Sequence, residues 1–395
     1  MATLRVPRDL ARKALNIADL RRLSRRRLPR GLFDFVDRGS EDEVSLRANR
    51  AQLDAVQFLP KMGIDVSGRC INTQLCGRAV SAPIVIAPTG MAAMLWPDGE
   101  FALASACAQF GVPYCNGTHA LTSLERLATI PGLDLWLQLY ILLDRTRMDA
   151  LIAKAKSCGV RTMVVTLDAN ISPNREYNQR SGFLPPLRPT WRNMIDVATH
   201  PRWALSTAMP WITTPPRFAN LSDDLSENLT HLSGVLPCRI DPSASWGRIK
   251  ELREIWHGDL LIKGVLRADD AARALECGAT GIIVSNHGGR SLDGAISAIA
   301  ALAKMAPALS KEMTVIFDSG ITRGADIARA LAIRADAVMI GRSTMWGIGA
   351  AGAEGALHAL NLLASEFDRV LGLLGVNSPE ELRPDLVQYG MPGNI

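Results

Sequence analysis

A histidine and an arginine three residues apart form the most reactive pair in this sequence. His287 and Arg290 follow the apolar run Gly281–Val284, with Gly288 and Gly289 between them. The run predicts a short buried strand, and the glycines predict a sharp turn at its carboxyl end. Imidazole titrates near neutral pH, and a guanidinium group binds a carboxylate through two hydrogen bonds. The pair therefore suits proton abstraction from an anionic substrate, although the turn alone is equally compatible with two solvated side chains.

Polar side chains also follow five other apolar runs that predict strands. In chain order the residues at these strand ends are Gln138 and Tyr140, Thr166 and Asp168, Lys263, Asp318 and Gly320, and Gly341 and Arg342, with Arg175 shortly after the second set. In a barrel of parallel strands, the carboxyl ends of the strands carry the chemistry. We therefore expect a single site, in which Asp168 stabilises the imidazolium that His287 becomes after it takes a proton.

Several of these residues suit a planar, phosphorylated cofactor. The loops after strands seven and eight of such barrels commonly bind phosphate. There, Gly320 and Gly341 allow a close approach of the backbone, and Arg342 supplies positive charge. Lys263 can stabilise negative charge that develops on a bound ring. Gln138 and Thr166 can form hydrogen bonds with the heteroatoms of that ring.

The elements that must position these residues alternate along the chain. The candidate strands are Ile84–Ala87, Val112–Cys115, Leu135–Leu139, Thr162–Thr166, Leu260–Lys263, Gly281–Val284, Thr314–Phe317 and Ala337–Ile340. Amphipathic stretches between them include Asp98–Gln109, Arg147–Cys158, Ala268–Cys277 and Gly324–Ile333. Eight strand–helix units predict an α/β fold of the (β/α)₈ TIM barrel type. A doubly wound sheet is the competitor, but the turn after the first run, Pro88-Thr89-Gly90-Met91, is not the glycine-rich turn that such a sheet requires.

We expect one domain over residues 1–395, with a helical segment at 1–60 and the barrel at about 84–375. An insert at about 184–245, between strand four and helix four, is longer than a helix and two loops require. It contains Trp191, Trp203 and Trp211 near Arg188, Arg192, Arg202 and Arg217. Two interpretations stay open: a patch that contacts a membrane surface, or a lid whose tryptophans pack inward.

The composition is typical of a soluble enzyme. The chain is 48% hydrophobic and 21% charged, and its net charge of +5 gives no reason to expect a nucleic acid partner. Seven cysteines without a CxxC pair indicate a reducing compartment and no structural metal site. The basic run Arg21–Arg27 is interpreted as the solvated face of a helix. The N-terminus is basic where a secretory signal would be apolar, and prolines interrupt the uncharged stretch Ala79–Pro97. We therefore expect no membrane span, and a protein that is either cytoplasmic or peripheral at the inner membrane.

Six segments resemble those of a known family. They are Ile86-Ala87-Pro88-Thr89-Gly90, Leu95 to Glu100, Leu137-Gln138-Leu139-Tyr140, Leu261-Ile262-Lys263-Gly264, Ser285 to Asp293, and Asp318-Ser319-Gly320. The chain resembles the FMN-dependent α-hydroxy acid oxidases and dehydrogenases from about Asn16 to about Asp385. The segment His200-Pro201-Arg202-Trp203 and the residue Gly90 look closest to the mandelate dehydrogenase branch.

The resemblance implies oxidation of an L-2-hydroxy acid, mandelate- or lactate-like, to the 2-keto acid, with hydride transfer to N5 of FMN. His287 would be the base, Asp168 its partner, Arg175 and Arg290 the carboxylate clamp, and Tyr140 a donor to the substrate oxygen. The residues implied to hold FMN are Pro88, Thr89, Gly90, Gln138, Thr166, Lys263, Ser285, Asp318, Gly320, Arg323, Gly341 and Arg342. The resemblance also implies a homotetramer, and oxygen, a quinone or another carrier as electron acceptor.

Three positions depart from the family pattern. Phe33 stands where the family has a tyrosine that binds the substrate carboxylate, Gly117 where it has a serine that contacts the flavin, and Thr322 where it has the first of two arginines. The loss of one carboxylate donor should weaken substrate binding by ~1–2 kcal/mol. Phe33 therefore motivates one alternative, the same chemistry on a bulkier or carrier-linked substrate. A hypothesis of a different class, a flavin-binding protein without turnover, would need a broken catalytic set, yet His287, Asp168, Arg175 and Arg290 are all present.

Overall fold

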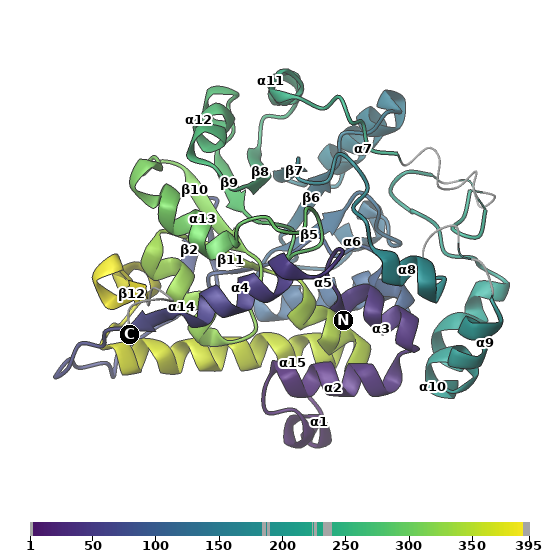
Figure 1. Ribbon diagram of the computed structural model, residues 1–395, viewed down its shortest axis with the longest axis horizontal. Helices are drawn as coiled ribbons and strands as arrows, with labels where there is room; N and C mark the ends of the chain where they lie inside the picture. The colour runs from purple at the N-terminus through teal and green to yellow at the C-terminus, as the bar shows by residue number, and fades with distance from the viewer. Residues whose placement is uncertain are drawn as a thin grey trace.

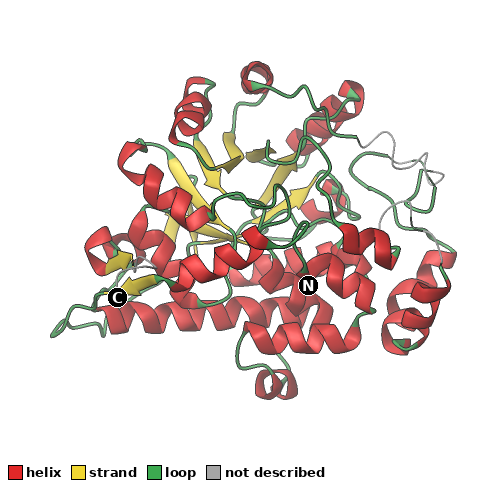
Figure 2. Ribbon diagram, in the orientation of Figure 1, coloured by secondary structure: helices red, strands yellow, loops and turns green. Residues whose placement is uncertain are grey.

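Eight parallel strands close into a barrel at the centre of the protein (Figures 1 and 2). The computed structural model describes residues 3–183, 187, 190–222, 224, 227–231 and 239–389. In barrel order the strands are β4 (Ile84–Ile86), β5 (Tyr114–Gly117), β6 (Leu135–Leu139), β7 (Thr162–Thr166), β8 (Asp259–Val265), β9 (Gly281–Val284), β10 (Thr314–Asp318) and β11 (Ala337–Ile340). The predicted (β/α)₈ barrel is confirmed, and the predicted bounds of β6, β7, β9 and β11 agree with the structure residue for residue.

The other four strands differ from their predicted bounds, β4 and β10 by one residue each at the carboxyl end, and β5 and β8 for identifiable reasons. β5 begins at Tyr114, two residues later than the predicted start, and Pro113 before it has no N–H with which to join the ladder. β8 continues past Lys263 to Val265 through an irregularity in its pairing with β9. The irregularity lies at Gly264, whose φ is +102° and where a Cβ atom would lie 2.5 Å from Cβ of Asp168. A glycine is needed there because it lets two strand ends approach closely at the barrel mouth.

Helices surround the barrel and bury its outer face (Figure 2). They are α5 (Gly99–Phe110), α6 (Leu124–Ala128), α7 (Arg145–Ser157), α11 (Trp246–Ile255), α12 (Ala268–Glu276), α13 (Ala298–Met305), α14 (Gly324–Ile333) and α15 (Arg342–Leu374). Apolar side chains such as Trp136, Val164 and Ile283 fill the barrel interior. The hairpin of β2 (Thr73–Leu75) and β3 (Arg78–Val80) packs against this cluster, so the barrel is a filled core and its chemistry is confined to the mouth.

The N-terminal segment reaches the barrel mouth. It contains α1 (Arg8–Lys13), α2 (Ile17–Arg27), α3 (Arg30–Asp37) and α4 (Val44–Asp54), followed by β1 (Val56–Phe58), which pairs with β12 (Val387–Tyr389). Asp293 accepts hydrogen bonds from the backbone N–H groups of Val44 and Ser45 at the start of α4. The N–H of Ser40 donates to the carbonyl of Gly289. The segment is therefore anchored to the loop that carries His287.

The insert between β7 and α11 lies to one side of the barrel (Figure 1). Its described elements are α8 (Glu176–Ser181), α9 (Trp191–Ala198), α10 (Pro201–Trp203), the π-helical turn η2 (Ala204–Ala208) and the 3₁₀ turn η3 (Met209–Ile212). Trp203 is buried and its indole N–H donates to the carbonyl of Met94 at 2.8 Å. Trp191, in contrast, is 69% exposed.

The tryptophans of the insert differ in exposure, and both interpretations of the insert stay predictions. A surface position for Trp203 is wrong, because this ring packs inward against Phe183 and Trp211. Trp191 has the outward position that a membrane patch requires. Arg188 lies outside the described residues. Within the described ranges, no helix is long and apolar enough to cross a membrane.

Candidate active site

A cavity of about 1840 Å³ opens at the carboxyl ends of the barrel strands. It is lined by predicted site residues from the strand ends and from the N-terminal segment: Phe33, Pro88, Thr89, Gly90, Gln138, Tyr140, Thr166, Arg175, Lys263, His287, Arg290, Asp318, Gly320, Arg323, Gly341 and Arg342. Asp168 and Ser285 do not line the cavity but contact residues that do. Residues up to 309 positions apart in the chain, from Phe33 to Arg342, thus meet around one space.

His287 and Asp168 form a hydrogen-bonded pair at this mouth. Nδ1 of His287 lies 2.9 Å from Oδ1 of Asp168. A carboxylate accepts hydrogen bonds, so Nδ1 carries the proton and Nε2 keeps its lone pair for a substrate. His287 has a φ of +58°, in the left-handed region that is costly for a residue other than glycine. Hydrogen bonds from its N–H to Oγ of Ser285 and from the N–H of Gly288 to Oγ of Ser319 hold the turn.

The electrostatics of the pair favour a neutral base beside an ionised acid. Burial lowers the pKa of His287 and outweighs the attraction to Asp168, and the positive charge of Lys263 lowers it further. Burial alone would raise the pKa of Asp168, but the contact with His287 and the charge of Lys263 together hold it below the usual value. The imidazole is therefore neutral near pH 7, while the carboxylate is ready to stabilise an imidazolium.

Three guanidinium groups gather at the same mouth and donate to backbone oxygens. Arg175 donates to the carbonyl of Arg290, and Arg290 donates to the carbonyls of Val36 and Arg38. Arg342 donates to the carbonyls of Val36, Gly288 and Arg38. In the described part of the chain, none of the three forms an ion pair with a carboxylate. Burial, followed by the charge of Arg290, lowers the pKa of Arg175 and that of Arg342 to about 10 each. Such an unbalanced positive cluster is suited to an anionic ligand.

The residues expected to hold FMN fit a flat polar ring and its phosphate. Lys263 is buried, pairs with Asp318 at 3.2 Å and donates to Oγ of Ser285 at 3.0 Å. Burial lowers the pKa of Lys263, but the negative charges of Asp318 and Asp168 raise it by more, so the ammonium group stays charged. Among the described residues, Oγ1 of Thr89 is buried without a hydrogen-bond partner, as expected of a group whose partner is a ligand.

Beside it, Nε2 of Gln138 donates to Oγ1 of Thr166 at 3.1 Å, so the threonine hydroxyl can in turn donate to a ring heteroatom. A Cβ atom at Gly117 would lie 3.6 Å from Oε1 of Gln138, in ordinary contact. The absence of the family serine at Gly117 therefore leaves space at the cavity wall.

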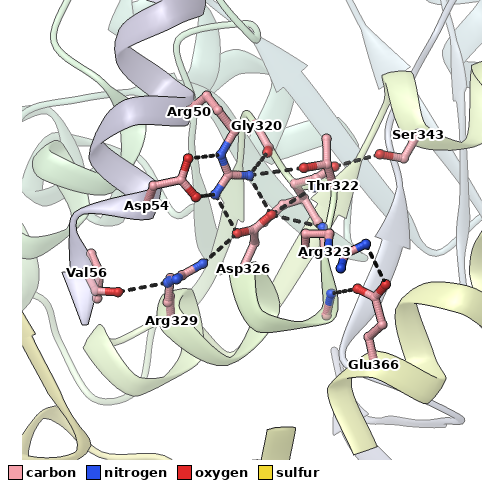
Figure 3. A network of polar contacts seen from close by, with 12 residues as sticks. Arg50, Asp54, Val56, Gly320, Thr322, Arg323, Asp326, Arg329, Ser343 and Glu366 are labelled. Carbon is pink, nitrogen blue, oxygen red and sulfur yellow. Dashed lines mark hydrogen bonds and ion pairs between the residues drawn. The ribbon is translucent and has the colours of Figure 1, made fainter. Parts of the chain in front are cut away.

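The loop after β10 carries a network that the sequence did not reveal (Figure 3). The carboxylate of Asp326 is fully buried and accepts two hydrogen bonds of 2.7 Å from Arg50 of α4. Arg50 also donates to the carbonyl of Gly320 and to Oγ1 of Thr322, each at 3.1 Å. Arg323 lies at the cavity edge and pairs with Glu366 of α15 at 3.0 Å. A guanidinium group therefore contacts Thr322 after all, but it comes from α4.

Two further residues with rings, Phe33 and His119, line the cavity. Phe33 is 4% exposed, and the guanidinium carbon of Arg21 lies 5.8 Å from the centre of its ring. The site has no hydroxyl at this position, as expected from the sequence. His119, which follows β5 and was not predicted, is a second imidazole in the cavity wall. A single histidine in a loop carries no spacing signal that would have identified it.

Comparison with known proteins places the chain in a family. The model of the FMN-dependent dehydrogenases matches residues 24–389. The chain is 36% identical to (S)-mandelate dehydrogenase of Pseudomonas putida over 96% of its own length and 95% of that protein. It is also 36% identical to L-lactate dehydrogenase of Pseudomonas syringae pv. syringae over 92% of its own length and 96% of that protein. The chain belongs to the FMN-dependent α-hydroxy acid dehydrogenase family.

Solved structures agree with this assignment. A crystal structure of the monotopic membrane protein (S)-mandelate dehydrogenase superposes with a TM-score of 0.89 at 36% identity, covering 95% of this chain and 99% of that one. A structure of mandelate oxidase with benzoyl-formic acid gives a TM-score of 0.80 at 33% identity, covering 95% of this chain and 98% of that one. The protein is thus an FMN-dependent oxidoreductase of this family, with FMN as its cofactor. The roles of individual site residues stay predictions.

Proposed function

We propose that this enzyme oxidises an L-2-hydroxy acid, mandelate- or lactate-like, to the 2-keto acid. The observation that carries the proposal is the 2.9 Å contact between His287 and Asp168 beside guanidinium groups without carboxylate partners among the described residues. Arg175 and Arg290 bind the substrate carboxylate, which fixes the hydroxyl-bearing carbon near the base. Tyr140 donates a hydrogen bond to the substrate oxygen.

Nε2 of His287 takes the hydroxyl proton, and the resulting imidazolium is stabilised by the carboxylate of Asp168. Bound FMN would supply a two-electron acceptor for the hydrogen of the same carbon and its electron pair, which balances the change of the alcohol to a carbonyl. Lys263, held by Asp318, would supply positive charge to the bound cofactor. Burial followed by the charge of Asp168 raises the pKa of Tyr140, which keeps this phenol a hydrogen-bond donor throughout.

Anaerobic mixing of the FMN-loaded enzyme with (S)-mandelate or L-lactate tests the proposal. We expect loss of the oxidised flavin absorbance with at least one of them and recovery of one equivalent of the keto acid. His287→Asn should keep FMN bound while slowing this reaction by ~10²–10⁴-fold. The proposal is refuted if the flavin stays oxidised with every 2-hydroxy acid tried, bulky and carrier-linked ones included. That result would indicate a flavin-binding protein without turnover.

We also propose that the insert contacts the inner membrane, where a quinone can accept the electrons. The support is an apolar surface on α9, η2 and η3 that we call the insert patch. It consists of Trp191, Met194, Ile195, Leu205, Met209 and Ile212, whose exposed fractions run from 54% to 82%. Soluble proteins rarely expose this many large apolar side chains within some twenty consecutive residues. The (S)-mandelate dehydrogenase named above is monotopic.

Sedimentation with anionic liposomes tests the insert patch. The protein should sediment at low salt, and Trp191→Ser combined with Ile212→Ser should release it to the supernatant while the rate of flavin reduction stays the same. Exposed Leu373 of α15 lies outside the patch, so Leu373→Ser is the matched control that should still sediment. Full recovery of the unaltered protein in the supernatant would disprove the contact. The homotetramer stays a prediction, which light scattering in solution can test.

A further inference from the structure

Helix α4 packs against two loops of the site, the turn of His287 and the loop after β10. A Cβ atom at Gly289 of the turn would lie 2.6 Å from the backbone nitrogen of Leu46 on this helix. A Cβ atom at Gly320 of the loop would lie 3.0 Å from Cδ1 of Leu53 on the same helix. The φ angles of the two glycines are +70° and +89°. Glycine therefore permits a close approach of both loops to one rigid element.

A buried pair of amides joins α4 to the turn of His287. Nδ2 of Asn49 donates to Oδ1 of Asn286 at 2.8 Å, and Nδ2 of Asn286 donates to Oδ1 of Asn49 at the same distance. Both side chains are buried. Asn286 directly precedes the base, and its Oδ1 also accepts the N–H of Gly289 at 3.1 Å. Because a buried amide that loses its partner is costly, Asn49 fixes the residue next to His287.

The next residue on the helix, Arg50, holds the loop after β10 (Figure 3). It donates to Gly320 and Thr322 and forms the bidentate pair with Asp326 described above. The carboxylate of Asp326 also accepts the backbone N–H groups of Thr322 and Arg323, at 3.0 Å each. Every nitrogen of the Arg50 guanidinium group already donates to a protein acceptor. Arg50 therefore acts on a ligand through the loop and not by contact.

Two further hydrogen bonds join the turn directly to the residues expected around the phosphate of FMN. The N–H of Gly288 donates to Oγ of Ser319, and Arg342 donates to the carbonyl of Gly288 at 2.8 Å. Ser319 has a φ of +107°, which is costly for a residue other than glycine and persists only where the surroundings hold it. The phosphate end of the site and the turn of the base are thus in contact.

We propose that Asn49 and Arg50 are positioning residues that couple the phosphate end of the FMN site to the base. This inference rests on the proposed function, in which His287 takes the proton. Neighbouring residues of one helix hold the two loops, so a displacement of either loop strains the other. Binding of the phosphate then stabilises the position of His287. The position of His287 in turn strengthens phosphate binding, since coupling between two sites is reciprocal.

A competition between two flavins tests the phosphate end without turnover. The FMN-loaded enzyme is equilibrated with riboflavin, which lacks the phosphate, and the ratio of the two bound flavins gives the preference for FMN. Arg50→Gln should lower this preference by about 10–100-fold, because the loop after β10 loses its support. Asn49→Leu breaks the amide pair on the side of the turn, and through the coupling it should lower the same preference by about 5-fold or more.

The rate of flavin reduction at full FMN loading tests the end of the base. Asn49→Leu should slow the reaction by about 10–100-fold, because a small displacement of a catalytic group is costly in rate. Arg50→Gln leaves the amide pair in place, yet the coupling predicts that it slows the reaction by about 5-fold or more. Arg50→Lys keeps the charge but not the fork of donors, and should lower the rate and the preference in the same direction. It replaces Arg50→Gln if that variant does not fold.

Arg329→Gln is the matched control. Arg329 pairs with the same carboxylate of Asp326 at 3.0 Å, and its other printed partner is the carbonyl of Val56, which lies in neither loop. This variant should lower the melting temperature as Arg50→Gln does, while the preference for FMN and the rate stay within about 3-fold. Equal effects of Arg329→Gln and Arg50→Gln on the preference would overturn the inference. So would variants that each affect only the loop they contact.

The preference for FMN separates this inference from the proposed function. If no 2-hydroxy acid reduces the flavin of the unaltered enzyme, the proposed function fails, and a lower preference in Asn49→Leu would still support the coupling. If the unaltered enzyme turns over while Asn49→Leu keeps its full preference for FMN, the proposed function stands and the coupling is refuted.

Discussion

Replacing Asp168 by Asn tests the electrostatic argument about the base most directly. The substitution keeps the shape of the side chain but removes its charge, 2.9 Å from Nδ1 of His287. At an effective dielectric constant of about 20, two unit charges this close attract by roughly 5 kcal/mol. The side chains of His287 and Asp168 are 21% and 12% exposed, so solvent screens part of that attraction. We expect the barrier to flavin reduction to rise by about 3–5 kcal/mol, which slows the reaction by roughly 10²–10⁴-fold.

The assay is anaerobic stopped-flow reduction of the FMN-loaded variant at saturating substrate, with flavin content measured separately. Asp149→Asn is the matched control, because Asp149 lies exposed on α7 and does not line the cavity. It should react like the unaltered enzyme. A rate for Asp168→Asn within tenfold of the unaltered rate would refute the role of the carboxylate. A variant that binds no FMN would point to a structural role for Asp168.

Three further outcomes follow from the geometry. Burial lowers the pKa of His287 below 6.5, and the base must be unprotonated to act. We therefore expect kcat/KM to be independent of pH near neutrality and to fall only below pH 6.5. A fall that begins above pH 7 would contradict this. Phe33→Tyr adds a hydroxyl to the cavity wall and should lower KM for a simple 2-hydroxy acid by several-fold, worth ~1 kcal/mol, whereas an unchanged KM would mean that Phe33 does not face the carboxylate. Arg50→Gln leaves the fully buried Asp326 without its bidentate partner and should lower the free energy of unfolding by about 2–4 kcal/mol in urea titrations. Lys13→Gln, which breaks an exposed pair with Asp9, should lower the free energy of unfolding by less than about 1 kcal/mol. Equal losses in the two variants would show that the buried pair of Arg50 and Asp326 stabilises the fold no more than an exposed pair does.

The barrel could be predicted because its strands are buried on both faces and read as continuous apolar runs. β6, β7, β9 and β11 are of this kind, and each ends where a polar residue enters the cavity. The catalytic candidates were found for the same reason, since a barrel brings strand ends together whatever their distance in sequence.

Other features could not be predicted because they depend on contacts that have no local pattern. Arg50 and Asp326 are 276 residues apart, and nothing near either residue indicates the pairing. The burial of Trp203 depends on the carbonyl of Met94, 109 residues away. The contact between the rings of Phe218 and His119 depends on how the insert folds back, and a sequence does not show where a long connection returns to the barrel.

The cluster of Arg175, Arg290 and Arg342 also bears on how the enzyme matures in the cell. Three like charges at one mouth repel each other unless an anion binds between them. This repulsion lowers the stability of the folded chain before FMN binds. A ligand that binds the folded chain and not the unfolded chain shifts the folding equilibrium in proportion to its concentration. We therefore expect the supply of flavin to set how much of the synthesised protein escapes proteolysis, as well as how much of it is active. Cells short of riboflavin would hold less of this protein, and not simply an idle pool of it.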